Sequence, residues 1–329
     1  MRTEVTKLSK KSSFFSVLFG RLACASVALV SYFLMGTIFP SVAVAQITYY
    51  YTDTELHRIN LATGTDTLLT VTPAFPAVTQ STALAVDNSG NVYFTNQQQI
   101  GQNGTAGSAI SIFQWTPTGS AASTTGAIST LCTLPSTFPA STGPGAWVGQ
   151  EVEFGRLTYD RASDSFYTLS SLVPGSPNPA VVFRIARVGC AISSVVAVTP
   201  VAGVPTTPGT GGDLVIVIGR TFVVGSNSSV NPALPTLWEI DEVTGQVLGA
   251  RSITGCPAGV TNLSGVSLSF DGSLIVSCAT AGVAVEVRII PAAAIAATIT
   301  GTGTIASTTP NLTGLPLIGD LVVRSPAWA

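Results

Sequence analysis

The chain has 329 residues, of which 46% are hydrophobic and only 9% are charged, whereas about a quarter of the residues in ordinary soluble domains are charged. All of its lysines lie within the first 11 residues, which excludes Schiff-base lysine chemistry from the rest of the chain. The net charge is −2 for the whole chain and −6 without its first 45 residues (nine basic and 15 acidic), which argues against nucleic acids and anionic membrane surfaces as partners.

The N-terminal residues 1–45 are typical of an export signal peptide. Five basic residues and a single acid lie in residues 1–21, and an apolar run follows over 22–39. Alanines at −3 and −1 predict cleavage before Gln46, which leaves nine basic and 15 acidic residues. The apolar run is also about long enough to span a bilayer, so an uncleaved anchor stays open as an alternative.

A repeated hairpin pattern indicates the fold. Residues 85–95 read Ala-Val-Asp-Asn-Ser-Gly-Asn-Val-Tyr-Phe-Thr, and 158–168 and 269–277 repeat this pattern. A second unit, Leu-x-x-Ile-Asn/Asp-x-x-Thr-Gly, occurs at 56–64 and 237–245. Strand-only repeats of this length are typical of β-propellers. We therefore expect an all-β chain, with one propeller domain over residues 46–329.

The repeats predict five blades, although the loops at 133–156 and 199–212 leave room for a sixth. Four blades of four short strands each are expected at 82–132, 157–198, 213–253 and 266–305. A fifth blade is expected to join the two termini and close the ring, which removes free sheet edges. Its innermost strand would be 319–324 and its other strands 47–52, 56–61 and 67–71.

Helix is expected at only one place. Residues 291–297 read Pro-Ala-Ala-Ala-Ile-Ala-Ala, with proline at a suitable first position, and predict one short helical turn.

The repeat at 83–95, Ala-Leu-Ala-Val-Asp-Asn-Ser-Gly-Asn-Val-Tyr-Phe-Thr, resembles that of NHL-type and gluconolactonase-like propellers. The Leu-x-x-Ile units resemble those of secreted bacterial propeller proteins. Both resemblances rest on hydrophobic and turn positions, so they imply the fold rather than a function. Gluconolactonase-like enzymes hold a divalent metal at the axial channel with Glu, Asn and Asp, and these ligands have no residue-by-residue match here.

Some polar residues of the repeats are expected to serve the fold. Asp87, Asp160 and Asp271 begin the inner hairpin turns, where an aspartate accepts hydrogen bonds from backbone N–H groups two residues on. His57 is the only histidine and aligns with Trp238 in the repeat, so we expect it to be packed between blades. A single histidine also excludes a His-based metal cluster and argues against a Ser-His-Asp triad.

The candidate binding residues lie where the chain enters successive blades. In a propeller the innermost strands line the axial channel, and the loops leading into them form a rim where ligands bind. Three charged residues sit between Gly and Leu at equivalent positions of this rim: Arg156, Asp213 and Asp320. The longest loop, just before the first of them, adds Trp147, Glu151 and Glu153.

Three interpretations of this rim stay open. Ca²⁺ would be ligated through oxygen by its four acids: Glu151, Glu153, Asp213 and Asp320. Alternatively, Trp147 and Arg156 would hold a sugar or a small acid. The third interpretation is solvated charge, with Arg–Asp pairing across the channel. Apart from Ca²⁺, no cofactor is predicted.

The cysteines agree with export. Four follow the leader, an even number that suits an oxidising compartment. Of the three pairings that four cysteines allow, we expect Cys256–Cys278, which belong to the entrance and inner hairpin of one blade. Cys132–Cys190 would then join the two preceding blades.

The function expected from these features is an exported, non-catalytic binding or interaction module at the cell surface or in the periplasm. Its partner would be a protein, a glycan or another copy of the chain. One alternative is a lactonase-like, metal-dependent hydrolase acting at the axial mouth. The other is a self-assembling subunit of a surface layer or fibre, suggested by the lysine-free, weakly charged exterior.

Overall fold

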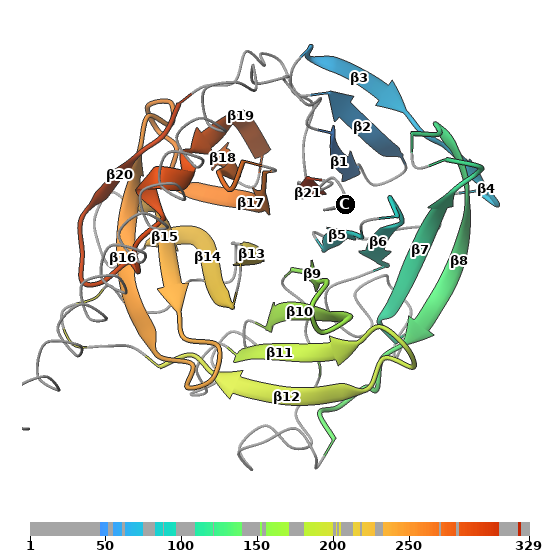
Figure 1. Cartoon of the computed structure of the whole chain (residues 1–329), viewed down its shortest axis with the longest axis horizontal. Coiled ribbons are helices and arrows are strands. Elements are labelled where there is room, and N and C mark those ends of the chain that lie inside the picture. Colours follow the sequence, from blue (N-terminus) through green and yellow to red (C-terminus); the bar gives the residue numbers. More distant parts are fainter. Residues whose placement is uncertain are drawn as a thin grey trace, which may run out of the picture. The chain divides into compact units, whose positions relative to one another are not determined.

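Short strands rich in β-branched and aromatic residues fold into five β-sheets that surround a common centre (Figure 1). This computed structural model describes residues 47–308 and 322–323 apart from a set of gaps. The gaps are 52–54, 61–62, 75–82, 88, 97–108, 121, 140–151, 153–155, 171–180, 200–201, 203, 205–212, 218, 228–232, 270 and 281–282. The chain divides into two units, Met1–Val44 and Ala45–Ala329, of which the first lies outside the described residues. Cleavage of the leader therefore stays a prediction.

The five sheets form a five-bladed β-propeller, as the repeats predicted. Within each blade, the consecutive strands pair antiparallel. Blade 1 contains β1 (Ile47–Tyr51), β2 (Leu56–Asn60) and β3 (Thr65–Leu68). Blade 2 contains β5 (Leu84–Val86), β6 (Val92–Thr95), β7 (Ser111–Pro117) and β8 (Thr125–Thr133). Blade 3 contains β9 (Thr158–Asp160), β10 (Ser165–Ser170), β11 (Val181–Ala186) and β12 (Ile192–Ala197).

The remaining two blades complete the set. Blade 4 contains β13 (Asp213–Val217), β14 (Arg220–Asn227), β15 (Leu234–Ile240) and β16 (Val247–Thr254). Blade 5 contains β17 (Asn262–Leu268), β18 (Leu274–Thr280) and β19 (Val283–Ile290). In blade 1, β21 (Val322–Val323) lies innermost and pairs antiparallel with β1. Ring closure through this pairing stays a prediction.

Two outer strands differ from the expected arrangement, because each joins a neighbouring blade. The segment expected as the outer strand of blade 1 splits, and β4 (Thr70–Thr72) pairs parallel with β8 of blade 2. The segment expected as the fourth strand of blade 5 contributes β20 (Thr304–Ala306), which pairs parallel with β16 of blade 4. Blade 5 therefore has three strands among the described residues. In both cases the added strand satisfies the edge N–H and C=O groups of a long outer strand.

The one helical element in the described residues lies between β19 and β20. The predicted turn of helix is present as a single 3₁₀ turn, η1 (Ala292–Ala294).

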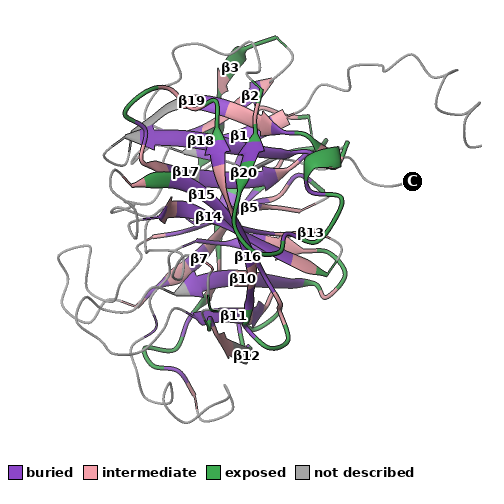
Figure 2. Ribbon diagram, turned by 90° about the vertical axis from the view of Figure 1, so that its left-hand side faces the viewer, coloured by how far each residue is buried: buried purple, intermediate pink, exposed green. Residues whose placement is uncertain are grey.

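Apolar side chains are buried between successive blades, while the turns at both ends of the strands are the more exposed parts (Figure 2). Between blades 3 and 4, Leu169 and Val182 pack with Val223 and Trp238 in one cluster. A similar cluster lies between blades 2 and 3. These contacts set the spacing of the turns at the blade ends.

Two disulfides form the predicted pairs. Cys132 of β8 bonds to Cys190 in the β11–β12 turn, which joins blade 2 to blade 3. Cys256, between β16 and β17, bonds to Cys278 of β18. Such bonds are typical of an oxidising, non-cytoplasmic environment. In the described part of the chain, no helix has the length and apolar character needed to cross a membrane.

Candidate functional site

The structure describes two of the six predicted rim residues. Trp147, Glu151, Glu153 and Asp320 lie outside the described residues. Arg156 and Asp213 are both buried, with 4% and 2% of their surface exposed. Convergence of the six residues, and the Ca²⁺ site built on four of them, therefore stay predictions. Within the described residues, no group of three or more His, Cys, Asp or Glu is placed to hold a metal ion.

Asp213 joins the innermost strands of two blades. Leu214 N–H donates to its Oδ1 at 2.7 Å, and Val266 N–H donates to its Oδ2 at 2.7 Å. Because Val266 belongs to β17, this carboxylate bridges blade 4 to blade 5. Asp213 thus holds the blades together at the centre, and its role as a ligand stays a prediction.

The turn aspartates have the structural role that the sequence predicted. Asp87 accepts hydrogen bonds from the Ser89 and Asn91 N–H groups at 2.8 and 3.0 Å, and from the Tyr93 hydroxyl at 2.8 Å. Asp160 likewise accepts from Ala162 N–H, Ser163 N–H and the Ser163 hydroxyl. Asp271 accepts from Ser273 N–H at 3.0 Å. Each carboxylate therefore satisfies the backbone of its own turn.

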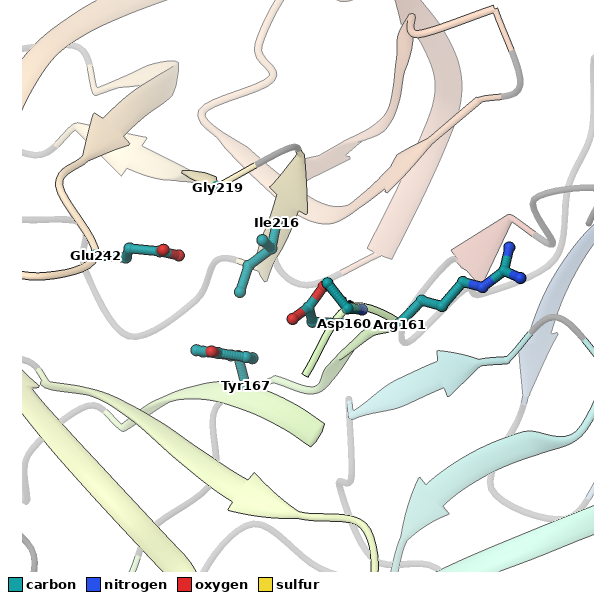
Figure 3. Close-up of a pocket in the computed structure, with 7 residues that line it drawn as sticks. Asp160, Arg161, Tyr167, Ile216, Gly219 and Glu242 are labelled. Atoms are coloured by element: carbon teal, nitrogen blue, oxygen red, sulfur yellow. Dashed lines mark hydrogen bonds between the residues drawn. The ribbon is translucent and has the colours of Figure 1, made fainter. Parts of the chain in front are cut away.

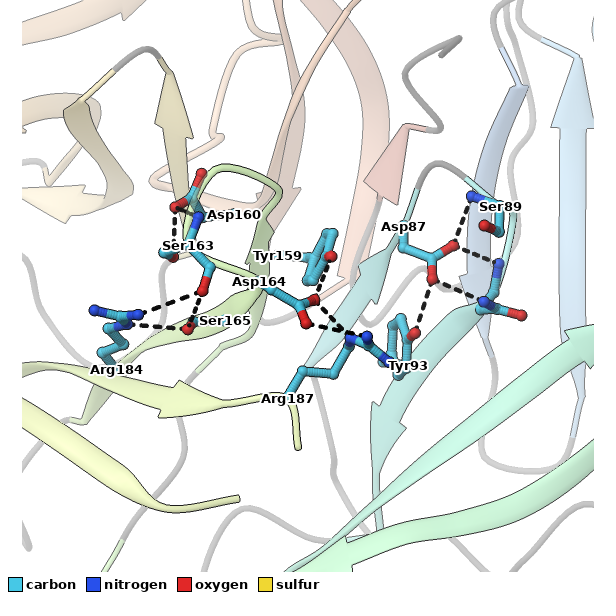
Figure 4. A network of polar contacts seen from close by, with 11 residues as sticks. Asp87, Ser89, Tyr93, Tyr159, Asp160, Ser163, Asp164, Ser165, Arg184 and Arg187 are labelled. Carbon is cyan, nitrogen blue, oxygen red and sulfur yellow. Dashed lines mark hydrogen bonds and ion pairs between the residues drawn. The ribbon is translucent and has the colours of Figure 1, made fainter. Parts of the chain in front are cut away.

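A polar network that the repeats did not reveal lies in blade 3, where it adjoins blade 2 (Figure 4). Arg187 makes a two-point ion pair with Asp164, whose Oδ1 also accepts the Tyr159 hydroxyl at 2.7 Å. Burial, followed by this hydrogen bond, raises the pKa of Tyr159 to about 12. The Tyr159 ring stacks on Tyr93 of blade 2, with 6.2 Å between ring centroids. All these polar groups are satisfied by one another, so the network supports the fold.

His57 has contacts within its own blade. Its ring stacks on Tyr50, with 4.6 Å between centroids. Its two ring nitrogens lie 3.3 Å from carboxylate oxygens of Asp66 and Glu55. Asp66 also accepts the Tyr50 hydroxyl at 2.7 Å. Both ring nitrogens are therefore engaged within blade 1, and the packing of His57 between blades stays a prediction.

A pocket of about 480 Å³ lies between blades 3 and 4, at the tips of three hairpin turns (Figure 3). The β9–β10, β13–β14 and β15–β16 turns all contribute, together with side chains of β10 and β13. The lining residues are Asp160, Arg161, Ala162, Tyr167, Ile216, Gly219 and Glu242. Its volume falls in the range of about 300–1,000 Å³ that is usual for small-ligand sites.

The pocket has an anionic side. Burial, followed by the negative charges of Asp160 and Asp241, raises the pKa of Glu242. Glu242 and Asp160 lie on opposite sides of Ile216, whereas the Arg161 side chain extends away from Glu242 (Figure 3). The pocket therefore combines negative charge with the Tyr167 ring and the aliphatic Ile216 side chain.

The repeat offers one signal for this site. Glu242 occupies the position of Leu61 in the matching unit at 56–64, so the blade 4 turn departs from the repeat by carrying a charge.

The five sheets define the class, a β-propeller protein, and the comparisons with known proteins do not narrow it. No protein-family model matches the sequence, and no curated protein does. A glutaminyl cyclase from Myxococcus xanthus is 14% identical, over 70% of this chain and 88% of its own, with a TM-score of 0.37. A GH43_12 protein from a capybara gut metagenome is 13% identical, over 74% and 44%, with a TM-score of 0.40.

A Lactobacillus plantarum protein is 12% identical, over 85% of this chain and 99% of its own, with a TM-score of 0.37. These are distant similarities to solved structures, and they assign no family. The resemblance to NHL-type and gluconolactonase-like repeats therefore stays a prediction at the level of the family.

Proposed function

We propose that the chain is an exported, non-catalytic binding module and that it holds its ligand in the pocket between blades 3 and 4. The observation that carries this proposal is the position of Glu242. Among the acids in the described part of the chain, Glu242 alone has neither a hydrogen bond nor an ion pair.

The other described acids serve the fold. They fix turns, as Asp87 does, bridge blades, as Asp213 does, pair with arginine, as Glu239 does, or contact His57, as Glu55 and Asp66 do. Among the described residues Glu242 has no such partner, and its surroundings disfavour its charge. A partly buried carboxylate without a partner is unfavourable to folding, so its presence in a pocket is better explained by a ligand.

Binding is favoured over catalysis by the state of the second pocket acid. Both Asp160 oxygens already accept hydrogen bonds from its own turn. General acid–base catalysis needs a group free to exchange a proton with the substrate, often as one of a pair. With Asp160 engaged, Glu242 is left as a single charge that holds a ligand. The two disulfides and the leader-like N-terminus support export to the cell surface or periplasm.

Filling the pocket tests this function. Ala162 is an exposed lining residue, so Ala162→Trp places an indole in the pocket without removing a buried side chain. Ala258→Trp, at an exposed alanine between β16 and β17, is the matched control. Thermal unfolding of the three proteins is followed with a panel of amino acids, diamines, sugars and short peptides.

We expect at least one compound to raise the unfolding temperature of the native chain and of Ala258→Trp in a saturable way, and to leave Ala162→Trp unchanged. The proposal is wrong if no compound stabilises the native chain, or if every compound that does so stabilises Ala162→Trp equally. Chemical conversion of a pocket ligand by the protein would overturn the non-catalytic assignment.

A further inference from the structure

We propose that the ligand held in this pocket carries an alkylammonium group, with the cation beside Glu242 and its carbon stem along Tyr167 and Ile216. This inference rests on the proposed function and adds the chemical class of the ligand. Aliphatic diamines and lysine side chains share this chemistry.

Charge is the first argument. Glu242 has no hydrogen-bond or ion-pair partner among the residues that the structure describes, and the neighbouring charges that act on it are the carboxylates of Asp160 and Asp241. A cation bound beside Glu242 would gain from all three of these charges. An anionic ligand would meet the same charges as repulsion. Among the described lining residues the one guanidinium is that of Arg161, and it extends away from Glu242 (Figure 3).

The lining argues for an organic cation over a metal ion. Ca²⁺ requires about six to eight oxygen ligands. In the pocket, the Asp160 oxygens are held by its turn, which leaves the Glu242 carboxylate with two oxygens. Tyr167, Ile216 and Ala162 instead offer surface to a carbon stem, and the face of a tyrosine ring attracts an ammonium group.

The composition of the chain bears on whether other copies of it could occupy the pocket. No lysine follows Lys11, whereas nine arginines lie after residue 45. A pocket selective for ammonium would therefore not be occupied by side chains from other copies of the propeller. A pocket that accepted any basic side chain would be open to those arginines.

Calorimetric titration of the full-length protein tests the ligand class. The probes are 1,5-diaminopentane and Nα-acetyl-lysine amide, and the tighter of the two identifies the source of the ammonium group. 1,5-Pentanediol has the same stem without charge, glutarate has the opposite charge, and CaCl₂ tests a metal. Glu242→Gln removes the charge at an accessible turn, and Glu55→Gln removes an exposed acid of blade 1 as the matched control.

We expect Glu242→Gln to weaken ammonium binding about tenfold or more, which is the loss expected for one charge-assisted hydrogen bond. Glu55→Gln should bind as the native chain does, and Tyr167→Phe, which keeps the ring, should bind better than Tyr167→Leu. Pentanediol should bind at least about tenfold more weakly than the diamine, because it lacks the charge.

Two results would overturn the ligand class and leave the binding module standing. One is that pentanediol or glutarate binds as tightly as the diamine and is blocked by Ala162→Trp. The other is that Ca²⁺ binds with the same dependence on Glu242. If neither these probes nor any compound of the wider panel binds, both the ligand class and the proposed function are wrong.

Discussion

Replacing Asp213 by asparagine tests how the innermost strands of blades 4 and 5 are held together. The two carboxylate oxygens accept the N–H groups of Leu214 and Val266, each at 2.7 Å. Asparagine keeps one acceptor oxygen and places an NH₂ group at the other position. Asp213→Asn therefore breaks one of the two hydrogen bonds and leaves a buried N–H facing another donor.

The expected loss of stability follows from these two hydrogen bonds. A hydrogen bond to a charged group contributes about 1.5–3 kcal/mol, and a buried polar group left without a partner costs about 1–3 kcal/mol. We expect Asp213→Asn to lower the free energy of unfolding by about 2–4 kcal/mol. Asp213→Ala loses both hydrogen bonds and should cost more. Because native domains are stable by only about 5–15 kcal/mol, asparagine is the better test.

Urea unfolding followed by tryptophan fluorescence and far-UV circular dichroism measures this loss. Asp271→Asn is the control, because Asp271 is an exposed acid that accepts a hydrogen bond from the N–H group of Ser273 in its own turn. A loss for Asp213→Asn no larger than for Asp271→Asn would refute the reasoning. The same assay with Ca²⁺ tests the predicted metal role, since a ligand at Asp213 would make Ca²⁺ stabilise the native chain but not Asp213→Asn.

Three other perturbations should have measurable effects. Arg220→Met removes the two-point ion pair to buried Glu239 and should lower the free energy of unfolding by about 3 kcal/mol. It also removes the bonds to the carbonyls of residues 295 and 297, so limited proteolysis should cut residues 297–303 faster. In the chain-entropy view, replacing both cysteines of Cys132–Cys190 by serine should cost about 4 kcal/mol, against about 3 kcal/mol for Cys256–Cys278. This follows because the pairs span 58 and 22 residues, and a reversed order in urea unfolding would contradict it. Glu242 has its pKa raised by burial and then by two neighbouring carboxylates, so stability is lost as the pH rises above the ordinary glutamate pKa. Glu242→Gln should therefore raise the unfolding temperature at pH 7 and leave it unchanged at pH 3, and equal effects at both pH values would show that the charge is not the cause.

The blades could be predicted because their information is local. The repeat at 85–95 forms β5, a turn and β6, and Asp87 closes that turn with hydrogen bonds to residues two to six positions on. Alternating strands and glycine turns repeat the same local solution in each blade. The disulfide pairs followed from this arrangement, because the blade order limits which cysteines can meet.

The parallel strands at the outer edges could not be predicted in the same way. β20 pairs with β16 of blade 4, and Arg220 of the same blade binds carbonyl groups 75 and 77 residues away in the segment before β20. No local pattern in the sequence marks either contact. One weak signal was present. A Cβ at Gly249, in the middle of β16, would lie 2.5 Å from the carbonyl oxygen of Ile299, so this strand requires glycine where the segment before β20 crosses it.

The pocket depends on tertiary structure for the same reason. Each of its three turns is recognisable in the sequence, but their meeting follows from the packing of Trp238 and its neighbours between blades 3 and 4. In sequence, Asp160 and Glu242 are both turn acids. Only the structure separates them, because Asp160 accepts hydrogen bonds from its own turn, whereas Glu242 has no partner in the described part of the chain.

The difference between Asp160 and Glu242 is informative because the chain without its leader has few charged residues in total. In a domain with many surface acids, one unpaired glutamate at a turn would be ordinary. Here the described acids are otherwise used for turns, blade bridges or ion pairs, so a charge that opposes folding stands apart. Leu61 at the matching turn of blade 1 shows that the repeat does not require an acid at this position. A carboxylate without a partner among the described residues, placed where two blades form a pocket, therefore fits the cation-binding site that we propose.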